Sequence, residues 1–126
     1  MNPFEFARSF ASAFAAQDAE ALAALIETTG TALTLTGAWA EGRAAAQDIF
    51  QAEFEGIFAQ ARLVTGKGSL EQLGPTTALL RQRFVVTGAL AGPGEELPRF
   101  GAMLVAVLRH SRTECTALNL SFTALT

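Results

Sequence analysis

The chain has 126 residues, the size of a single domain spanning 1–126, and half of these residues are hydrophobic. Its net charge of −3 argues against general nucleic-acid binding, and its one cysteine, Cys115, excludes an intrachain disulfide or a cysteine zinc cluster. The sequence has no apolar run of membrane-spanning length and no basic, apolar leader, so we expect a cytoplasmic protein without a membrane partner.

The N-terminal region has its apolar residues at helical spacing. Segment 2–5 reads Asn-Pro-Phe-Glu, which suits a helix start because Asn can cap, Pro fits the first turn and Glu can bond back to the cap. Phe6, Phe10 and Phe14 then share one face of this helix. A second, shorter helix is predicted to begin at Asp18.

Shorter elements follow in the next part of the chain. The Thr-Thr-Gly at 28–30 ends the second helix, and the alternating residues 31–36 predict a short strand. Residues 37–42 read as a loop. A broad apolar stripe over about 43–58 predicts a third helix.

Strand spacing dominates after residue 61. Four strands are predicted, at roughly 63–73, 77–90, 99–110 and 114–125. Helices followed by a run of antiparallel strands predict an α+β fold, with three N-terminal helices packed on one face of a mostly antiparallel sheet.

Pairing the strands around their turns divides the sheet into two faces. This pairing places Phe84 opposite Met103, and Met103 opposite Leu120. The bulkier face, expected under the helices, carries Leu80, Gln82, Phe84, Val86, Met103, Val105, Val107, Leu118, Leu120 and Phe122. The other face carries Arg81, Arg83, Val85, Leu104, Ala106, Cys115, Ala117, Asn119 and Ser121. A slip of one residue exchanges the two faces.

Several strings, in their order along the chain, are similar to those of a known family. They are 10–25 with Asp18-Ala19-Glu20-Ala21-Leu22, Gly37, Gly42-Arg43, 83–88 (Arg-Phe-Val-Val-Thr-Gly), 99–101 (Arg-Phe-Gly) leading to 107–109, and Asn119. On these residues the chain resembles the nuclear transport factor 2-like superfamily, in its SnoaL-like bacterial branch and most closely its SgcJ/EcaC-like members.

The resemblance implies a cystatin-like, cone-shaped fold, in which a strongly bent sheet wraps around the helices and encloses an apolar pocket. It also implies a dimer. Relatives include isomerases, dehydratases, cyclases and epoxide hydrolases, together with noncatalytic binding and assembly domains, so the fold leaves the function open.

The chain departs from the catalytic relatives at the residues that carry their chemistry. It has no Tyr to donate to an oxyanion, and its one histidine, His110, is expected in a turn. Leu118 stands where that branch often has His, and Arg112 replaces the usual Trp of the last hairpin. These losses argue against acid–base catalysis by the routes of the family.

Two polar residues are candidates for catalysis. Glu53 interrupts the apolar stripe of the third helix, so it is either a buried base with a raised pKa or a carboxylate that reaches water at the edge of the stripe. Gln82 lies on the predicted pocket face, where it would orient a ligand or satisfy a buried backbone group.

Binding residues follow from the two faces. The predicted ligand contacts are Phe84, Met103, Val105 and Leu118, capped by Trp39, whose ring would stack on a ligand or pack in the core. The second face is too apolar to be freely solvated, so we expect a homodimer that packs sheet against sheet. Its predicted interface residues are Arg81, Arg83 and Asn119. In the slipped register, Arg83 and Asn119 would instead enter the pocket and bind an anionic ligand.

No cofactor or metal is predicted, because one His, one Cys and scattered carboxylates make no ligand set and no phosphate-binding loop is present. Three hypotheses remain. One is a domain that holds a small hydrophobic molecule in the cone, with proton transfer of the isomerase or dehydratase type as its chemistry. Another is a noncatalytic dimeric interaction or assembly module. The third is a vestigial member of the family with a filled core. Whether the protein is an enzyme stays open at this point.

Overall fold

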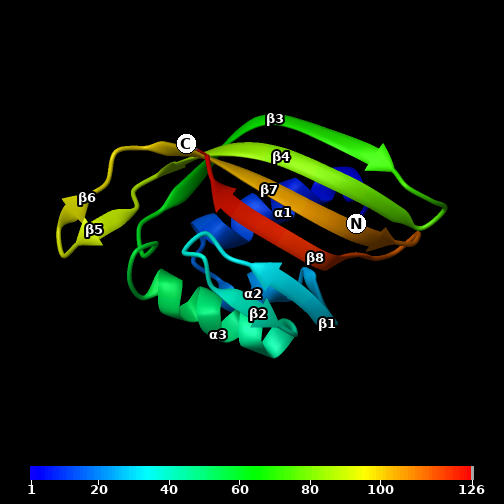
Figure 1. The fold of residues 1–126 in the computed structure, drawn as a ribbon, viewed down its shortest axis with the longest axis horizontal. Coiled ribbons are helices and arrows are strands. Elements are labelled where there is room, and N and C mark those ends of the chain that lie inside the picture. The colour runs from blue at the N-terminus through cyan, green and yellow to red at the C-terminus, as the bar shows by residue number, and fades with distance from the viewer. Residues whose placement is uncertain (126) are drawn as a thin grey trace.

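The computed structural model describes residues 1–125, which form three helices and one main sheet (Figure 1). The helices are α1 (Pro3–Ala15), α2 (Ala19–Ala23) and α3 (Arg43–Phe54). The predicted cap at Asn2 is confirmed, because its side chain accepts a bond from the Glu5 N–H. Asp18, predicted to begin the second helix, is the cap before it, and its side chain accepts a bond from the Ala21 N–H.

The main sheet has six strands in the order β2-β1-β8-β7-β4-β3. Their bounds are β1 (Ile26–Leu33), β2 (Trp39–Glu41), β3 (Arg62–Gln72), β4 (Thr77–Thr87), β7 (Phe100–His110) and β8 (Cys115–Ala124). Neighbouring strands are antiparallel except β1 and β8, which run parallel. The short strands β5 (Leu90–Gly92) and β6 (Glu95–Glu96) form a separate ribbon. The α+β class is confirmed, and the sheet is mixed but largely antiparallel.

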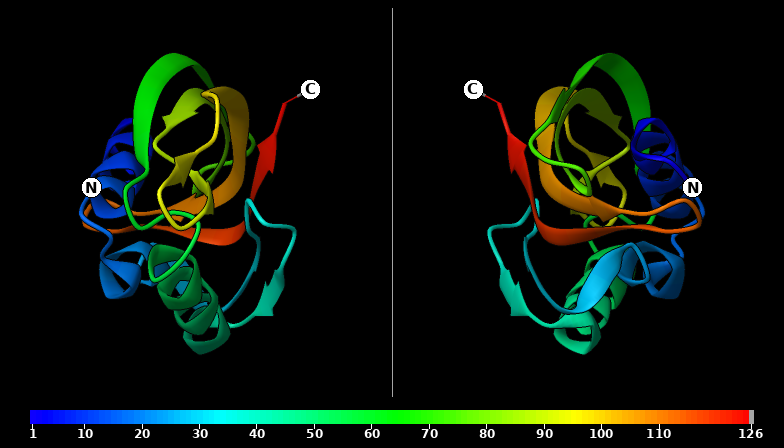
Figure 2. Two further views of the ribbon diagram at one scale, coloured as in Figure 1. Left: turned by 90° about the vertical axis from the view of Figure 1, so that its left-hand side faces the viewer. Right: turned by 90° about the vertical axis from the view of Figure 1, so that its right-hand side faces the viewer.

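The sheet is strongly bent, and its concave face covers the helices. Figure 2 shows β3, β4 and β7 forming an arch with α1 beside β3, while α2 and α3 lie below β8. The three helices and the inner face of the sheet share one hydrophobic core. Phe6, Phe10 and Phe14 are all buried in it, as the helical stripe predicts.

Several predicted boundaries are wrong. The second helix has only five residues, and β1 already begins at Ile26. The strand predicted at 31–36 is the last part of β1, which ends at Leu33. It ends there because a turn follows, in which the Gly37 N–H donates to the Thr34 carbonyl. The predicted loop at 37–42 contains β2, and α3 ends at Phe54, earlier than predicted.

The predicted register between β4 and β7 is wrong by one residue. Phe84 pairs with Ala102, and Met103 pairs with Arg83. The reason lies in the β5–β6 ribbon, where Gly92 pairs with Glu95 but Leu90 pairs with Glu96, so that Ala91 is an extra residue on one side. That single residue moves the whole of β7 to the opposite pleat.

The consequence is an exchange of faces along β7. Met103, Val105 and Val107, predicted under the helices, lie on the outer face of the sheet. The inner face instead carries Ala102, Leu104, Ala106 and Leu108 from β7 with Cys115 and Ala117 from β8. Leu80, Phe84, Val86, Leu120 and Phe122 are buried on the inner face as predicted.

The turn between β7 and β8 is also longer than the two residues predicted. His110 pairs with Cys115, and the Ser111 N–H bonds to the Glu114 carbonyl between them. A register shift follows in β8, where Ala117 and Asn119 have partners in β7 and Leu118 has none. Leu118 is therefore the residue of a β-bulge, and it does not lie on the pleat that carries Phe84.

Candidate functional site

The interior of the cone is filled by aromatic rings. Phe10, Phe14, Phe84 and Phe122 contact one another between α1 and the sheet, with ring centroids 5.1–6.4 Å apart. Two further rings from the region of α3, Phe54 and Phe58, pack against Phe14. All six rings are 0–6% exposed. Phe84, predicted to contact a ligand, is thus packed ring against ring in the core.

Glu53 is buried on α3, with only 7% of the residue exposed. Its Oε2 accepts hydrogen bonds from the hydroxyls of Thr34 at 2.7 Å and Thr36 at 2.6 Å. These bonds tie α3 to the turn that follows β1. The expectation that this carboxylate reaches water at the edge of the stripe is wrong, and its hydroxyl partners make it a link between elements.

Sequence reasoning missed the two threonine partners of Glu53. Thr34 is 2% exposed, although it belongs to a segment predicted to be an ordinary strand. The signal that was available is the Thr-x-Thr spacing at 34–36 directly before a glycine, which places two hydroxyls on the same side of a turn.

Gln82 serves the backbone of the sheet. Its Nε2 donates to the carbonyls of Gly66 at 2.9 Å, Lys67 at 3.2 Å and Arg83 at 3.0 Å. Gly66 and Lys67 lie where the register between β3 and β4 shifts, and such irregular positions leave carbonyls without ladder partners. A side chain at Gly68 would collide with the Gln82 carboxamide. The Gln82 carboxamide therefore satisfies backbone carbonyls at this irregular position, two of them on the exposed residues Gly66 and Lys67, and a role of Gln82 toward a ligand stays a prediction.

The five predicted ligand contacts are not brought together. Met103 and Val105 are paired with Arg83 and Arg81 on the outer face, and Leu118 lies at the bulge of β8. Trp39 is 54% exposed on β2 instead of covering a pocket. Its Nε1 donates to Glu41 at 3.3 Å.

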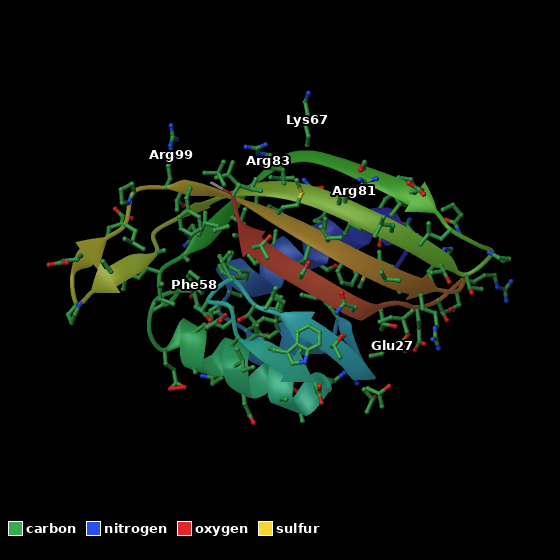
Figure 3. All side chains as sticks on the ribbon, viewed as in Figure 1. Glu27, Phe58, Lys67, Arg81, Arg83 and Arg99 are labelled. Atoms are coloured by element: carbon green, nitrogen blue, oxygen red, sulfur yellow. The ribbon has the colours of Figure 1, made fainter. Side chains whose placement is uncertain are left out.

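The three predicted interface residues do lie on the outer face of the sheet. In Figure 3, Arg81 and Arg83 project from β4 on the side away from the helices. Arg81 is 3.7 Å from Glu71, its neighbour on β3. Asn119 donates to the Thr31 hydroxyl at 2.7 Å, across the parallel pair of strands.

Apolar residues surround these polar groups on the outer face. They are Leu33, Leu79, Val85, Met103, Val105 and Val107, all partly exposed. One lateral row of this face can be followed across five strands through the register, from β4 to β2: Arg81, Val105, Ser121, Leu33 and Trp39. The outer face is the side of the sheet that points away from the helices, and it comprises these apolar residues, this row, Arg83 and Asn119.

Two open hollows lie away from the predicted pocket. One, of about 460 Å³, is lined by residues 55–57, Ala59 and 90–93, at the end of the molecule that carries the β5–β6 ribbon. The other, of about 530 Å³, is polar and is lined by Glu27, Thr28, Thr29, Arg43, Thr76, Arg109, His110, Ser111, Glu114 and Thr116. Neither includes Phe84, Met103, Val105, Leu118 or Trp39.

Two further titratable candidates, His110 and Cys115, lie opposite each other where β7 ends and β8 begins. Burial raises the pKa of the Cys115 thiol, while the N-terminal ammonium acts in the opposite direction, so the thiolate is disfavoured. His110 contacts Gln72 at 2.9 Å. Within residues 1–125 there is no group of three His, Cys, Asp or Glu side chains placed to hold a metal, and no helix long and apolar enough to cross a membrane.

Helices under a strongly bent, largely antiparallel sheet define the cystatin-like or nuclear transport factor 2-like fold, and comparison with solved structures confirms it. An uncharacterized protein with a cystatin-like fold from Caulobacter vibrioides superposes with a TM-score of 0.85 at 15% identity, over 98% of this chain and 87% of that chain. A nuclear transport factor 2-like protein with a cystatin-like fold from Novosphingobium aromaticivorans gives a TM-score of 0.75 at 21% identity, over 96% of this chain and 78% of that chain.

A third neighbour is a putative calcium/calmodulin dependent protein kinase II association domain from Xanthomonas campestris. It gives a TM-score of 0.79 at 15% identity, over 97% of this chain and 84% of that chain. Proteins described as ketosteroid isomerase-like and as a putative scytalone dehydratase also share the fold. No protein-family model matches the chain, and no curated protein matches its sequence. At these identities the comparisons establish the fold alone.

Proposed function

We propose that this chain is a noncatalytic assembly domain that forms a homodimer through the outer face of its sheet. The observation that carries the proposal is the contrast between a cone interior filled by aromatic rings and an outer face that is apolar and uncovered. In a sheet with one solvated face, apolar residues usually point to the core and polar residues point to the solvent. Here the face away from the core carries Val, Leu and Met side chains among the arginines.

The edges of the sheet support association by its face. On one edge, β2 has only three residues, which is too short to template another strand. On the other edge, β3 is interrupted by a register shift and carries the exposed Lys67. Short strands, bulges and edge lysines are the devices that prevent edge-to-edge pairing. The Xanthomonas neighbour, described as an association domain, agrees with an assembly role on this fold.

The dimer is tested by measuring molar mass across a concentration series with light scattering. We expect a dimer at micromolar concentration, and Val105→Glu, which places a charge at the centre of the outer face, should yield a folded monomer. Phe4→Glu, an exposed apolar position on α1 at the other side of the sheet, is the matched control and should remain dimeric. A wild-type monomer throughout the series would overturn the proposal. We place the dimer in the bacterial cytoplasm, in keeping with its lone buried thiol.

A second function is the binding of a small hydrophobic molecule, with isomerase or dehydratase-type proton transfer as its chemistry. The observation that favours it is the hollow of about 460 Å³ beside Ile57 and Leu90, a volume in the range of small-molecule sites. The ketosteroid isomerase-like and scytalone dehydratase-like neighbours agree with it. Thermal-shift screening against steroids, polyketides and aromatic acids tests it, since a ligand of the native state must raise the melting temperature, and a flat response excludes it.

A further inference from the structure

Trp39 and Glu41 form an exposed pair at one edge of the outer face. Both side chains project from β2 on the side opposite the buried Ala40. The indole N–H donates to Glu41 Oε1 at 3.3 Å, which holds the carboxylate beside the ring. An aromatic face next to a carboxylate suits a guanidinium, because the ring attracts the cation and the carboxylate pairs with it.

A guanidinium stands at the other end of the same lateral row. Arg81 on β4 is linked through Val105, Ser121 and Leu33 to Trp39, and three strands separate β4 from β2. The Arg81 side chain is 53% exposed, and its contact with Glu71 is long, at 3.7 Å. Such an exposed pair contributes little and leaves the guanidinium available.

Symmetry decides how two such rows meet. In a face-to-face dimer the twofold axis lies in the plane between the two sheets, and its two limiting directions are along the strands and across them. An axis across the strands lays β4 on β4 of the second copy and brings Arg81 and Arg83 close to their own equivalents, a like-charge contact that costs free energy.

An axis along β8 reverses the row onto itself. Arg81 then faces Trp39 of the second copy, Val105 faces Leu33, and Ser121 faces its own equivalent, because β8 is the middle strand of this row. Glu41 lies two residues farther along β2, on the same face as Trp39 and within reach of the same guanidinium. In this arrangement the cation meets an aromatic ring, the apolar side chains meet each other, and the serine hydroxyls meet each other.

We propose, on the basis of the dimer described above, that the occupant of the Trp39–Glu41 pair is Arg81 of a second copy of this chain. The twofold axis runs along β8, and the contact occurs twice in each dimer. The row therefore sets the relative orientation of the two subunits as well as their affinity.

Charge reversal tests this contact. Arg81→Glu and Glu41→Arg should each raise the dimer dissociation constant roughly 10- to 100-fold, because each places like charges together, and the double variant should recover most of the loss. Arg99→Glu is the matched control, since it changes the net charge equally but precedes β7 and lies outside the row (Figure 3). It should leave the dissociation constant within about threefold of wild type.

The single tryptophan supplies a readout that needs no substitution. Its emission should shift to shorter wavelength with the same midpoint as dimer formation, because a covered indole leaves water. A dimer with unchanged Trp39 emission, or without recovery in the double variant, would overturn this contact and leave the dimer standing. A monomer at every concentration would overturn both proposals.

Discussion

The two faces of one sheet show how differently the same strands are used. The inner face is nearly closed to solvent, and phenylalanine rings from the helices and strands fill it. The outer face alternates arginine with Val, Leu and Met at intermediate exposure. Neighbouring residues along β4 therefore have different roles. Phe84 contributes to the stability of the fold, and Val85 contributes to the proposed association. The contrast predicts that substitutions on the two faces separate these properties.

The largest effect is expected for Phe84→Ala. Phe84 is 0% exposed and contacts the rings of Phe10 and Phe122, so its truncation leaves a cavity that the surrounding rings cannot close. We expect a loss of about 3–5 kcal/mol in the free energy of unfolding, measured with urea below the dissociation concentration of the dimer. Val85→Ala, the next residue on the opposite face, should cost less than about 1 kcal/mol under those conditions. Equal losses at both positions would erase the distinction between the faces.

A smaller loss is expected for Glu53→Ala. The change removes the acceptor shared by the Thr34 and Thr36 hydroxyls, and it leaves the buried Thr34 only its longer contact with the Thr36 hydroxyl at 3.3 Å. We expect about 2–3 kcal/mol less stability in urea unfolding. Glu55→Ala, at the exposed end of the same helix, is the control and should change little. If both substitutions were neutral, the link between α3 and the turn after β1 would have no energetic role.

The smallest effect concerns Cys115 at the end of the inner face. Its folded pKa is raised above the ordinary value of 9.0, so the thiol ionises more readily in the unfolded chain. The stability that it contributes is present below pH 9 and is lost as the pH rises through its folded pKa. Urea midpoints measured between pH 8 and pH 10 should fall less steeply in Cys115→Ala, and identical slopes in the two proteins would contradict this.

Local patterns predicted the parts of the fold that local chemistry governs. The helix cap at Asn2, the helix start at Asp18, the phenylalanine stripe of α1 and the alternation along β4 are all present. The face of β7 was not predictable from its own residues, because its small and branched residues, Ala102 to Leu108, suit either side. One extra residue in the β5–β6 ribbon decided it.

The candidate site was predictable only in part, because the partners of its residues come from distant parts of the chain. Glu53 and Gln82 were recognisable as polar residues in apolar surroundings, and both are buried. Their partners come from other elements, the turn after β1 and the irregular stretch of β3, so their roles depend on tertiary packing. Arg81, Arg83 and Asn119 were assigned to the outer face correctly, because β4 keeps its alternation throughout and Asn119 follows the bulge of β8.

The parallel pairing of β1 with β8 has a consequence for biosynthesis. Thr31 and Asn119, which the pairing brings together, are 88 residues apart, so β1 joins β8 only after β8 has been synthesised. Pairing across so long a separation is slow, and until it forms, the edge of β1 is open to pairing with other chains, which favours aggregation.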